Sequence, residues 1–194
     1  NRIQWRATII FGVCQNALYL GLNFIAMQTV QASLAAIIAA TMPLLVALAS
    51  WLLFKERLRP LGVAGLMAGV LGVGLIMGTR ISAGVDLYGM ALCGLGVLAL
   101  TVATLALRGA TSGGNFMMVV GLQMLVGSAL LFVAALLFED IYINPTLSLA
   151  LAFAYTTLVP GLIATFIWVL LLNRIGPLRA ATFHFLNPVF GVAV

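Results

Sequence analysis

The sequence predicts an all-α polytopic membrane protein, and three observations support this fold class. The 194-residue chain is 64% hydrophobic and 7% charged, with a mean hydropathy of +1.23, whereas soluble domains carry about 25% charged residues. Apolar runs of about 20 residues, the length of a membrane-spanning helix, are separated by short polar connections. Basic residues gather in alternate connections. This composition argues against a water-soluble enzyme or a nucleic-acid-binding protein, and makes the lipid bilayer the expected surroundings.

Cutting the chain at its polar connections yields the candidate spans, in order. They are Ala7–Met27, Ala32–Phe54, Leu61–Thr79, Leu87–Leu107, Phe116–Phe138, Leu147–Leu172 and Arg179–Val194. The first six are long enough to cross a hydrocarbon core of about 30 Å at about 1.5 Å per residue. The last is too short, so we expect the chain to be a piece of a longer protein.

The few charged residues predict how these spans are oriented. Eight of the nine basic residues fall in one set of alternate connections, namely Arg2, Arg6, Lys55, Arg57, Arg59, Arg108, Arg174 and Arg179. The other set holds Arg80 with Asp86, Glu139 and Asp140. Short loops rich in Lys and Arg stay on the cytoplasmic side. We therefore expect the connections containing Lys55, Arg57, Arg108 and Arg174 to be cytoplasmic.

An internal repeat is indicated when the chain is shifted by 145 positions against itself. Ala35-Ala36 then aligns with Ala180-Ala181, and Met42-Pro43 aligns with Asn187-Pro188. The second span thus maps onto the seventh, which implies about five helices per repeat. Because that number is odd, successive repeats enter the membrane from opposite sides, as in transporters with inverted repeats. We assign residues 1–80 to helices three to five of the first repeat and residues 81–194 to helices six to nine of the second.

Several sequence stretches resemble the EamA domain of the drug/metabolite transporter superfamily. They are Pro43–Ala49 (PLLVALA), Phe54–Leu58 (FKERL), the glycine-rich Gly62–Gly78 and, in the second half, Asn173–Pro177 (NRIGP). Lys55 stands where the family commonly has Gly. The resemblance implies a ten-helix inverted-repeat transporter fold in a bacterial inner membrane. Within the superfamily the chain looks most like exporters of amino acids and related metabolites, aromatic amino acids among them.

Polar side chains at membrane depth are the candidates for binding a substrate, because such groups are costly in lipid unless they face a cavity or another helix. We select His184, Asn187, Asn16, Tyr19, Asn23, Thr41, Trp168 and Thr101. His184 and Asn187 come first, since they share a helix face and His184 is the only histidine. Each has a structural alternative: an interhelical hydrogen bond, a bond from Thr to its own helix, or an interfacial anchor for Trp168.

Three prolines predict interruptions of the spans. Pro43, Pro160 and Pro188 lie within apolar runs, and a proline inside a helix costs about 3 kcal/mol. Interrupted helices at repeat-related positions commonly mark the central site of a transporter. We therefore expect these positions to act as kinks or gates.

The absence of charge inside the spans restricts the substrate and the mechanism. No Lys or Arg lies in the middle of a span, so nothing resembles the basic clamp that a phosphorylated solute requires. We expect a secondary transporter that exports neutral or zwitterionic small molecules, with no cofactor, metal or nucleic acid and with a monomeric or homodimeric state. The alternatives are a facilitative channel, a structural membrane subunit and, less favoured, an intramembrane enzyme, for which His184 has no obvious nucleophile.

Overall fold

The computed structural model describes residues 2–55, 60–81, 86–110, 116–139 and 144–187. This part of the chain is all-helical, and no strand occurs in it. Five of its helical segments are long and apolar enough to cross a membrane: Arg2–Ala26, Ala32–Phe54, Leu87–Leu107, Phe116–Phe138 and Leu147–Ile175. The predicted fold class, an all-α multi-pass membrane protein, is confirmed.

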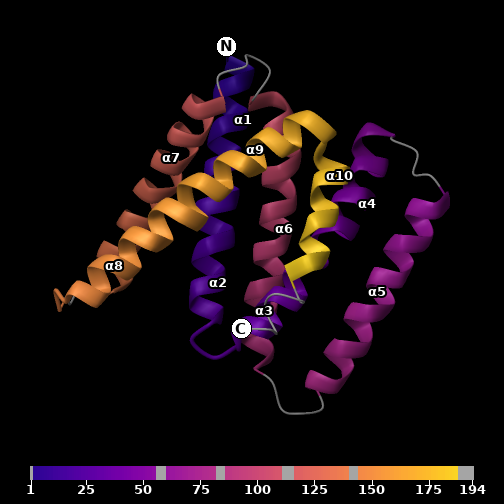
Figure 1. Cartoon of the computed structure of the whole chain (residues 1–194), viewed down its shortest axis with the longest axis horizontal. Helices are drawn as coiled ribbons and strands as arrows, with labels where there is room; N and C mark the ends of the chain where they lie inside the picture. The colour runs from indigo at the N-terminus through magenta and orange to yellow at the C-terminus, as the bar shows by residue number, and fades with distance from the viewer. Residues whose placement is uncertain (1, 56–59, 82–85, 111–115, 140–143, 188–194) are drawn as a thin grey trace.

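The first span is one long rod made of α1 (Arg2–Gly12), the π-helical η1 (Val13–Leu20) and α2 (Gly21–Ala26) (Figure 1). It begins at Arg2, five residues before the predicted start at Ala7. Hydropathy locates the edge of the hydrocarbon layer, whereas the helix continues past it with basic side chains that reach toward water.

The second span is interrupted. The α3 helix (Ala32–Ala39) ends in a turn at Ala40–Thr41, and α4 (Met42–Phe54) begins directly after it. Pro43 lies in the first turn of α4, where its missing N–H leaves no hydrogen bond unmade. The interruption is therefore as predicted, but the proline begins a helix and does not lie inside one.

The remaining described elements follow the predicted order. They are α5 (Pro60–Ile81), α6 (Leu87–Ala110), α7 (Phe116–Phe138), α8 (Leu147–Thr156), the π-helical η2 (Thr157–Ile163), α9 (Ala164–Ile175), α10 (Pro177–Ala181) and the 3₁₀ segment η3 (Thr182–Leu186). The α7 helix has the predicted bounds. The predicted seventh span is described only as far as Asn187, so Pro188 lies outside the described residues.

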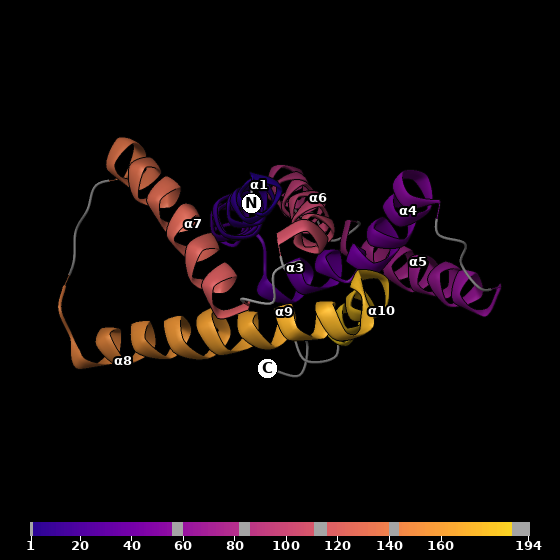
Figure 2. The same ribbon diagram turned by 90° about the horizontal axis from the view of Figure 1, so that it is seen from above.

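Two apolar clusters meet on α6, which lies near the middle of the bundle (Figures 1 and 2). One joins α6 to α2, α3 and α4 around Met42 and Val97. The other joins it to α1, α7 and α9 around Phe11 and Val169. The α8 helix has no buried residue and extends away from the bundle (Figure 2). Its exposed leucines and phenylalanine are what a lipid-facing surface requires.

The helix ends agree with the alternation of charge along the sequence. The start of α1, the end of α4 and the junction of α9 with α10 lie at one end of the bundle, at the top of Figure 1. The turn between α2 and α3 and the start of α6 lie at the opposite end. The basic connections at Arg2, Lys55 and Arg174 thus share one end.

The same shift of 145 positions also relates irregular features of the helices. It places the π-helical Val13–Leu20 on residues 158–165, which overlap the second π-helical segment, Thr157–Ile163. It also places the turn at Ala40–Thr41 on residues 185–186, at the end of the 3₁₀ segment Thr182–Leu186. The shift thus relates departures from α-helix in the two halves of the described chain.

Candidate functional site

A cavity of about 480 Å³ lies between the two π-helical segments. Its walls come from six parts of the fold: η1 with α2, α6, α7, the end of α8 with η2, α9, and η3. The lining residues are Gln15, Asn16, Tyr19, Leu20, Phe24, Leu100, Met124, Thr156, Pro160, Gly161, Ala164, Thr165, Trp168 and His184. The walls are mainly apolar and aromatic, with amide, hydroxyl and ring N–H groups placed among them. None of these lining side chains is Lys, Arg, Asp or Glu.

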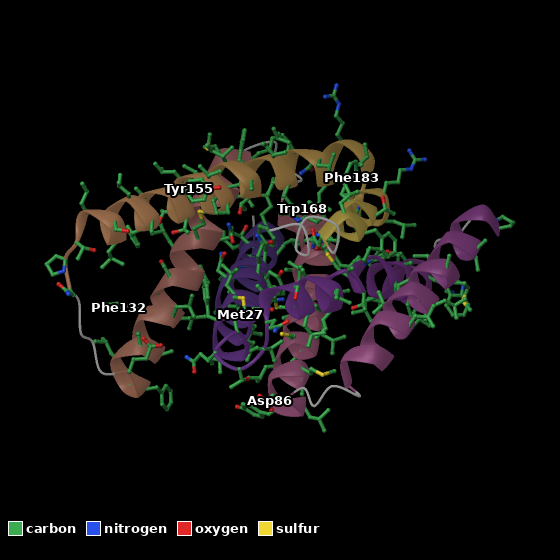
Figure 3. The ribbon with its side chains drawn as sticks, turned by 60° about the horizontal axis from the view of Figure 1, so that its bottom comes forward. Met27, Asp86, Phe132, Tyr155, Trp168 and Phe183 are labelled. Atoms are coloured by element: carbon green, nitrogen blue, oxygen red, sulfur yellow. The ribbon has the colours of Figure 1, made fainter. Side chains whose placement is uncertain are left out.

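Five of the residues selected from the sequence line this cavity: Asn16, Tyr19, Pro160, Trp168 and His184. In Figure 3, Trp168 lies on the inner side of α9, whereas Phe132 lies on the outer flank of α7. The structure therefore brings together one helix from each predicted repeat and the start of the seventh span.

His184 is held by contacts on two sides. The Trp168 and His184 rings meet edge to face, with centroids 5.0 Å apart and an interplanar angle of 81°. Nδ2 of Asn187 lies 3.0 Å from Nδ1 of His184. The amide nitrogen of Asn187 is a donor, so in this pairing Nδ1 of His184 accepts. Asn187 is absent from the cavity wall, so its contact orients the histidine.

Three predicted binding residues lie outside the cavity wall and bond to their own helices. Oγ1 of Thr41 donates to the carbonyl of Ile38 at 2.7 Å, and Oγ1 of Thr101 donates to that of Val97 at 2.9 Å. Nδ2 of Asn23 donates to the carbonyl of Tyr19 at 2.7 Å. Short polar side chains in helices commonly form such hydrogen bonds to nearby backbone carbonyls.

Asn23 packs against α6 and does not line the cavity. A Cβ on Gly96 would lie 2.8 Å from Nδ2 of Asn23 and 3.5 Å from Cδ2 of Tyr19. The expectation that Asn16, Tyr19 and Asn23 line one wall, from their i, i+3 and i+7 spacing, therefore holds for Asn16 and Tyr19 only.

Two further amides at or beside the cavity were not predicted from the sequence. Gln15 lines the cavity, and its Oε1 is buried without a hydrogen-bond partner. Gln123, on α7, is fully buried and accepts from Nδ2 of Asn16 through both its side-chain oxygen and its backbone carbonyl, the latter at 3.2 Å. A mid-span amide in an otherwise apolar helix is the signal that identifies Gln123.

The cavity offers uncharged hydrogen-bonding groups on a mainly apolar wall. The lining residues include no carboxylate, Ser or Cys, and the hydroxyl of Thr156 donates to its own helix, to Ala152 at 2.9 Å. In the described ranges, no group of three or more His, Cys, Asp or Glu side chains is placed to hold a metal ion. What remains is an apolar, aromatic chamber with donors and acceptors that suit a small solute.

Comparison with known proteins identifies one family. No match to the chain was found among curated proteins or among solved structures. The model of the EamA-like transporter family matches residues 1–78, which include α1 to α4 and most of α5. The first three predicted spans of this multi-pass chain are therefore similar to the EamA-like transporter family.

Proposed function

We propose that this protein is a secondary transporter of the drug/metabolite transporter superfamily, of the EamA type. It exports small neutral or zwitterionic metabolites, amino acids in particular, across a bacterial inner membrane. The observation that carries the proposal is the cavity of about 480 Å³ between the two π-helical segments, lined by uncharged side chains. Small-molecule sites have volumes of about 300–1,000 Å³, so an amino acid fits.

The placement of the cavity supports transport over a static binding role. Its walls combine the first span, from the first predicted repeat, with the sixth and seventh spans, from the second. Alternating access rocks one repeat against the other around a site at their interface. The interruptions at Ala40–Thr41 and within η2 supply places where such helices can bend.

The lining predicts the class of solute. Trp168, Tyr19 and Phe24 offer aromatic and apolar surface to a side chain, while Gln15 offers an unpartnered acceptor to an ammonium or hydroxyl group. Without Lys or Arg in the wall, a phosphate would lose its hydration with no charge to replace it. A neutral or zwitterionic solute meets no such penalty.

The test is a counterflow screen in proteoliposomes containing the purified protein. Amino acids, nucleosides and a sugar phosphate are offered as labelled solutes, with and without a pH gradient. We expect saturable exchange of at least one neutral or zwitterionic solute and none of the sugar phosphate. Flux that does not saturate would indicate a channel instead. Absence of flux for every solute would overturn the proposal and favour a structural subunit.

A further inference from the structure

Gln123 is the most deeply buried amide in the described part of the chain, with no exposed surface. It lies on α7, beside the middle of η1. Its side-chain oxygen and its backbone carbonyl both accept from Nδ2 of Asn16, and its own Nε2 has no partner. A buried amide is costly unless its hydrogen bonds are made, so the bond to Asn16 is the main compensation that this position receives.

Two glycines let η1 approach α7 closely enough for that bond. A Cβ on Gly12 would lie 2.5 Å from the backbone oxygen of Gln123 and 3.1 Å from Cβ of Val126. A Cβ on Gly127 would overlap Cβ of Asn16. Both positions flank the amide pair, one on each helix. Backbone contact of this kind is typical of small residues at helix interfaces in membranes.

The segment that Gln123 contacts is also the segment that shapes the cavity. Gln15, Asn16, Tyr19 and Leu20 all belong to η1 and all line the wall. A π-helix has poorer intrinsic stability than an α-helix and is found mostly where tertiary contacts or function require it. If η1 reverted to α-helix, the residues on either side of Asn16 would rotate relative to one another about the helix axis, and η1 would present a different set of side chains to the cavity.

We infer that Gln123 is a positioning residue, which acts through Asn16 to keep η1 π-helical and so places Gln15 and Tyr19 in the cavity wall. The claim that Gln123 affects solute binding rests on the proposed function. The claim that Gln123 holds η1 against α7 does not depend on it. Asn16 consequently serves the cavity through its backbone position, because its amide nitrogen is already engaged by Gln123.

The native Cys14 reports on η1 directly. It belongs to η1 and is partly exposed, whereas the other cysteine, Cys93, is buried on α6. In a Cys93→Ser background, the rate of Cys14 alkylation by N-ethylmaleimide is measured by mass spectrometry in detergent. We expect Gln123→Leu to change this rate by about fivefold or more, since it removes the side-chain acceptor of Asn16 and leaves only the backbone carbonyl of residue 123. Gln123→Glu keeps a side-chain acceptor and is expected to stay within about twofold of the parent.

A second pair of variants separates positioning from stability. Asn16→Leu combined with Gln123→Leu removes both amides and leaves no unpaired polar group, so it is expected to fold even if Gln123→Leu alone does not accumulate. This double variant should show the altered Cys14 rate. Ser128→Ala, an exposed position on the same helix, should not. For a solute found by counterflow, Gln123→Leu should raise KM more than it lowers kcat, and Gln123→Glu should restore KM.

The outcomes are distinct. A parental Cys14 rate in both Leu-containing variants would overturn the inference. A changed Cys14 rate with unchanged KM would also overturn the claim that Gln123 sets the binding wall. If no solute is transported but Cys14 responds as expected, the positioning of η1 stands and the proposed function fails.

Discussion

Trp168 and His184 meet edge to face in the wall of the cavity, with ring centroids 5.0 Å apart and planes at 81°. The pair joins α9 to η3, two segments connected by α10. Edge-to-face aromatic contacts contribute about 0.5–1.5 kcal/mol. The contact therefore fixes the corner of the cavity where the sixth and seventh predicted spans meet.

Replacing Trp168 with Ala is expected to lower exchange of the transported solute by at least about tenfold. The substitution removes a wall of the cavity and the support of the His184 ring, and losses of about 1.4 kcal/mol already correspond to tenfold. Ile167→Ala is the matched control, because Ile167 is next to Trp168 in the sequence but its side chain is exposed. Equal exchange by both variants in proteoliposomes would remove Trp168 from the site.

His184→Ala and Asn187→Ala should both reduce efflux while expression stays intact. Asn187 acts through its bond to Nδ1 of His184, and loss of a hydrogen bond to a part-buried group costs about 1–3 kcal/mol. We expect His184→Ala to have the larger effect, since only His184 lines the cavity. Phe183→Ala is the control, as its side chain is half exposed on the same segment. Unchanged flux in both variants would contradict this role.

Gly127→Ala is expected to destabilise the protein by about 1–3 kcal/mol, the usual cost of overpacking. Its added methyl group would overlap Asn16 and push η1 away from α7. Gly121→Ala on the same helix meets no atom within 4 Å, and should be neutral or stabilising by up to about 1 kcal/mol through helix propensity. Thermal unfolding in detergent distinguishes them. A midpoint for Gly127→Ala at or above that of Gly121→Ala would refute the close contact.

Lys55→Gly should stabilise the fold. Lys55 ends α4 with φ 55° and ψ 27°, the left-handed conformation, which costs a residue with a Cβ about 1–2 kcal/mol. Lys55→Ala removes the charge but keeps the Cβ, so its unfolding midpoint should not rise. A rise of equal size in both variants would assign the effect to charge instead.

Asp86 should contribute stability that is present at neutral pH and lost only in acid. The hydroxyl of Thr29 donates to its Oδ2 at 2.6 Å, and this bond, more than those from the backbone N–H groups of Gly89 and Tyr88, lowers the pKa of Asp86 below its ordinary value of 3.8. A lowered folded pKa means that the contribution is complete above 3.8 and disappears as pH falls through the folded value.

The measurement compares Asp86→Ala with the parent at several pH values. The unfolding midpoint of the variant should be lower at pH 7, and the difference should shrink as the solution is acidified below the ordinary pKa of the carboxyl group. Glu139→Gln, at an exposed position, is the control. A difference that grows on acidification would contradict the assigned hydrogen bond.

Hydropathy and charge alternation are sufficient to predict the helices. The bounds of α7 match the apolar run Phe116–Phe138, because the bilayer sets the length of the run independently of what the helix packs against. The interruption before Pro43 is also predictable from the sequence. The form of this interruption cannot be predicted, because a proline can either kink one helix or occupy the first turn of the next helix.

The candidate site could be predicted only in part. His184, Trp168, Asn16 and Tyr19 are identified as polar or aromatic groups at membrane depth. The packing of Asn23 against Gly96 of α6 and the π-helical turns of Val13–Leu20 are not visible in the spacing of polar residues along the sequence. The role inferred for Gln123 depends on its contact with Asn16, which lies 107 positions earlier in the sequence. No local sequence pattern predicts that contact.

The proposed function requires that the transported solute bind in the cavity between η1 and α9. Trp168 tests it directly, because the other two tryptophans, Trp5 and Trp51, are exposed and can be replaced by Phe. In that Trp5→Phe, Trp51→Phe variant, the fluorescence of Trp168 is titrated with a solute that counterflow has identified. We expect a saturable change in Trp168 fluorescence, with a midpoint close to the KM for exchange. Active exchange with no change in Trp168 fluorescence would contradict it.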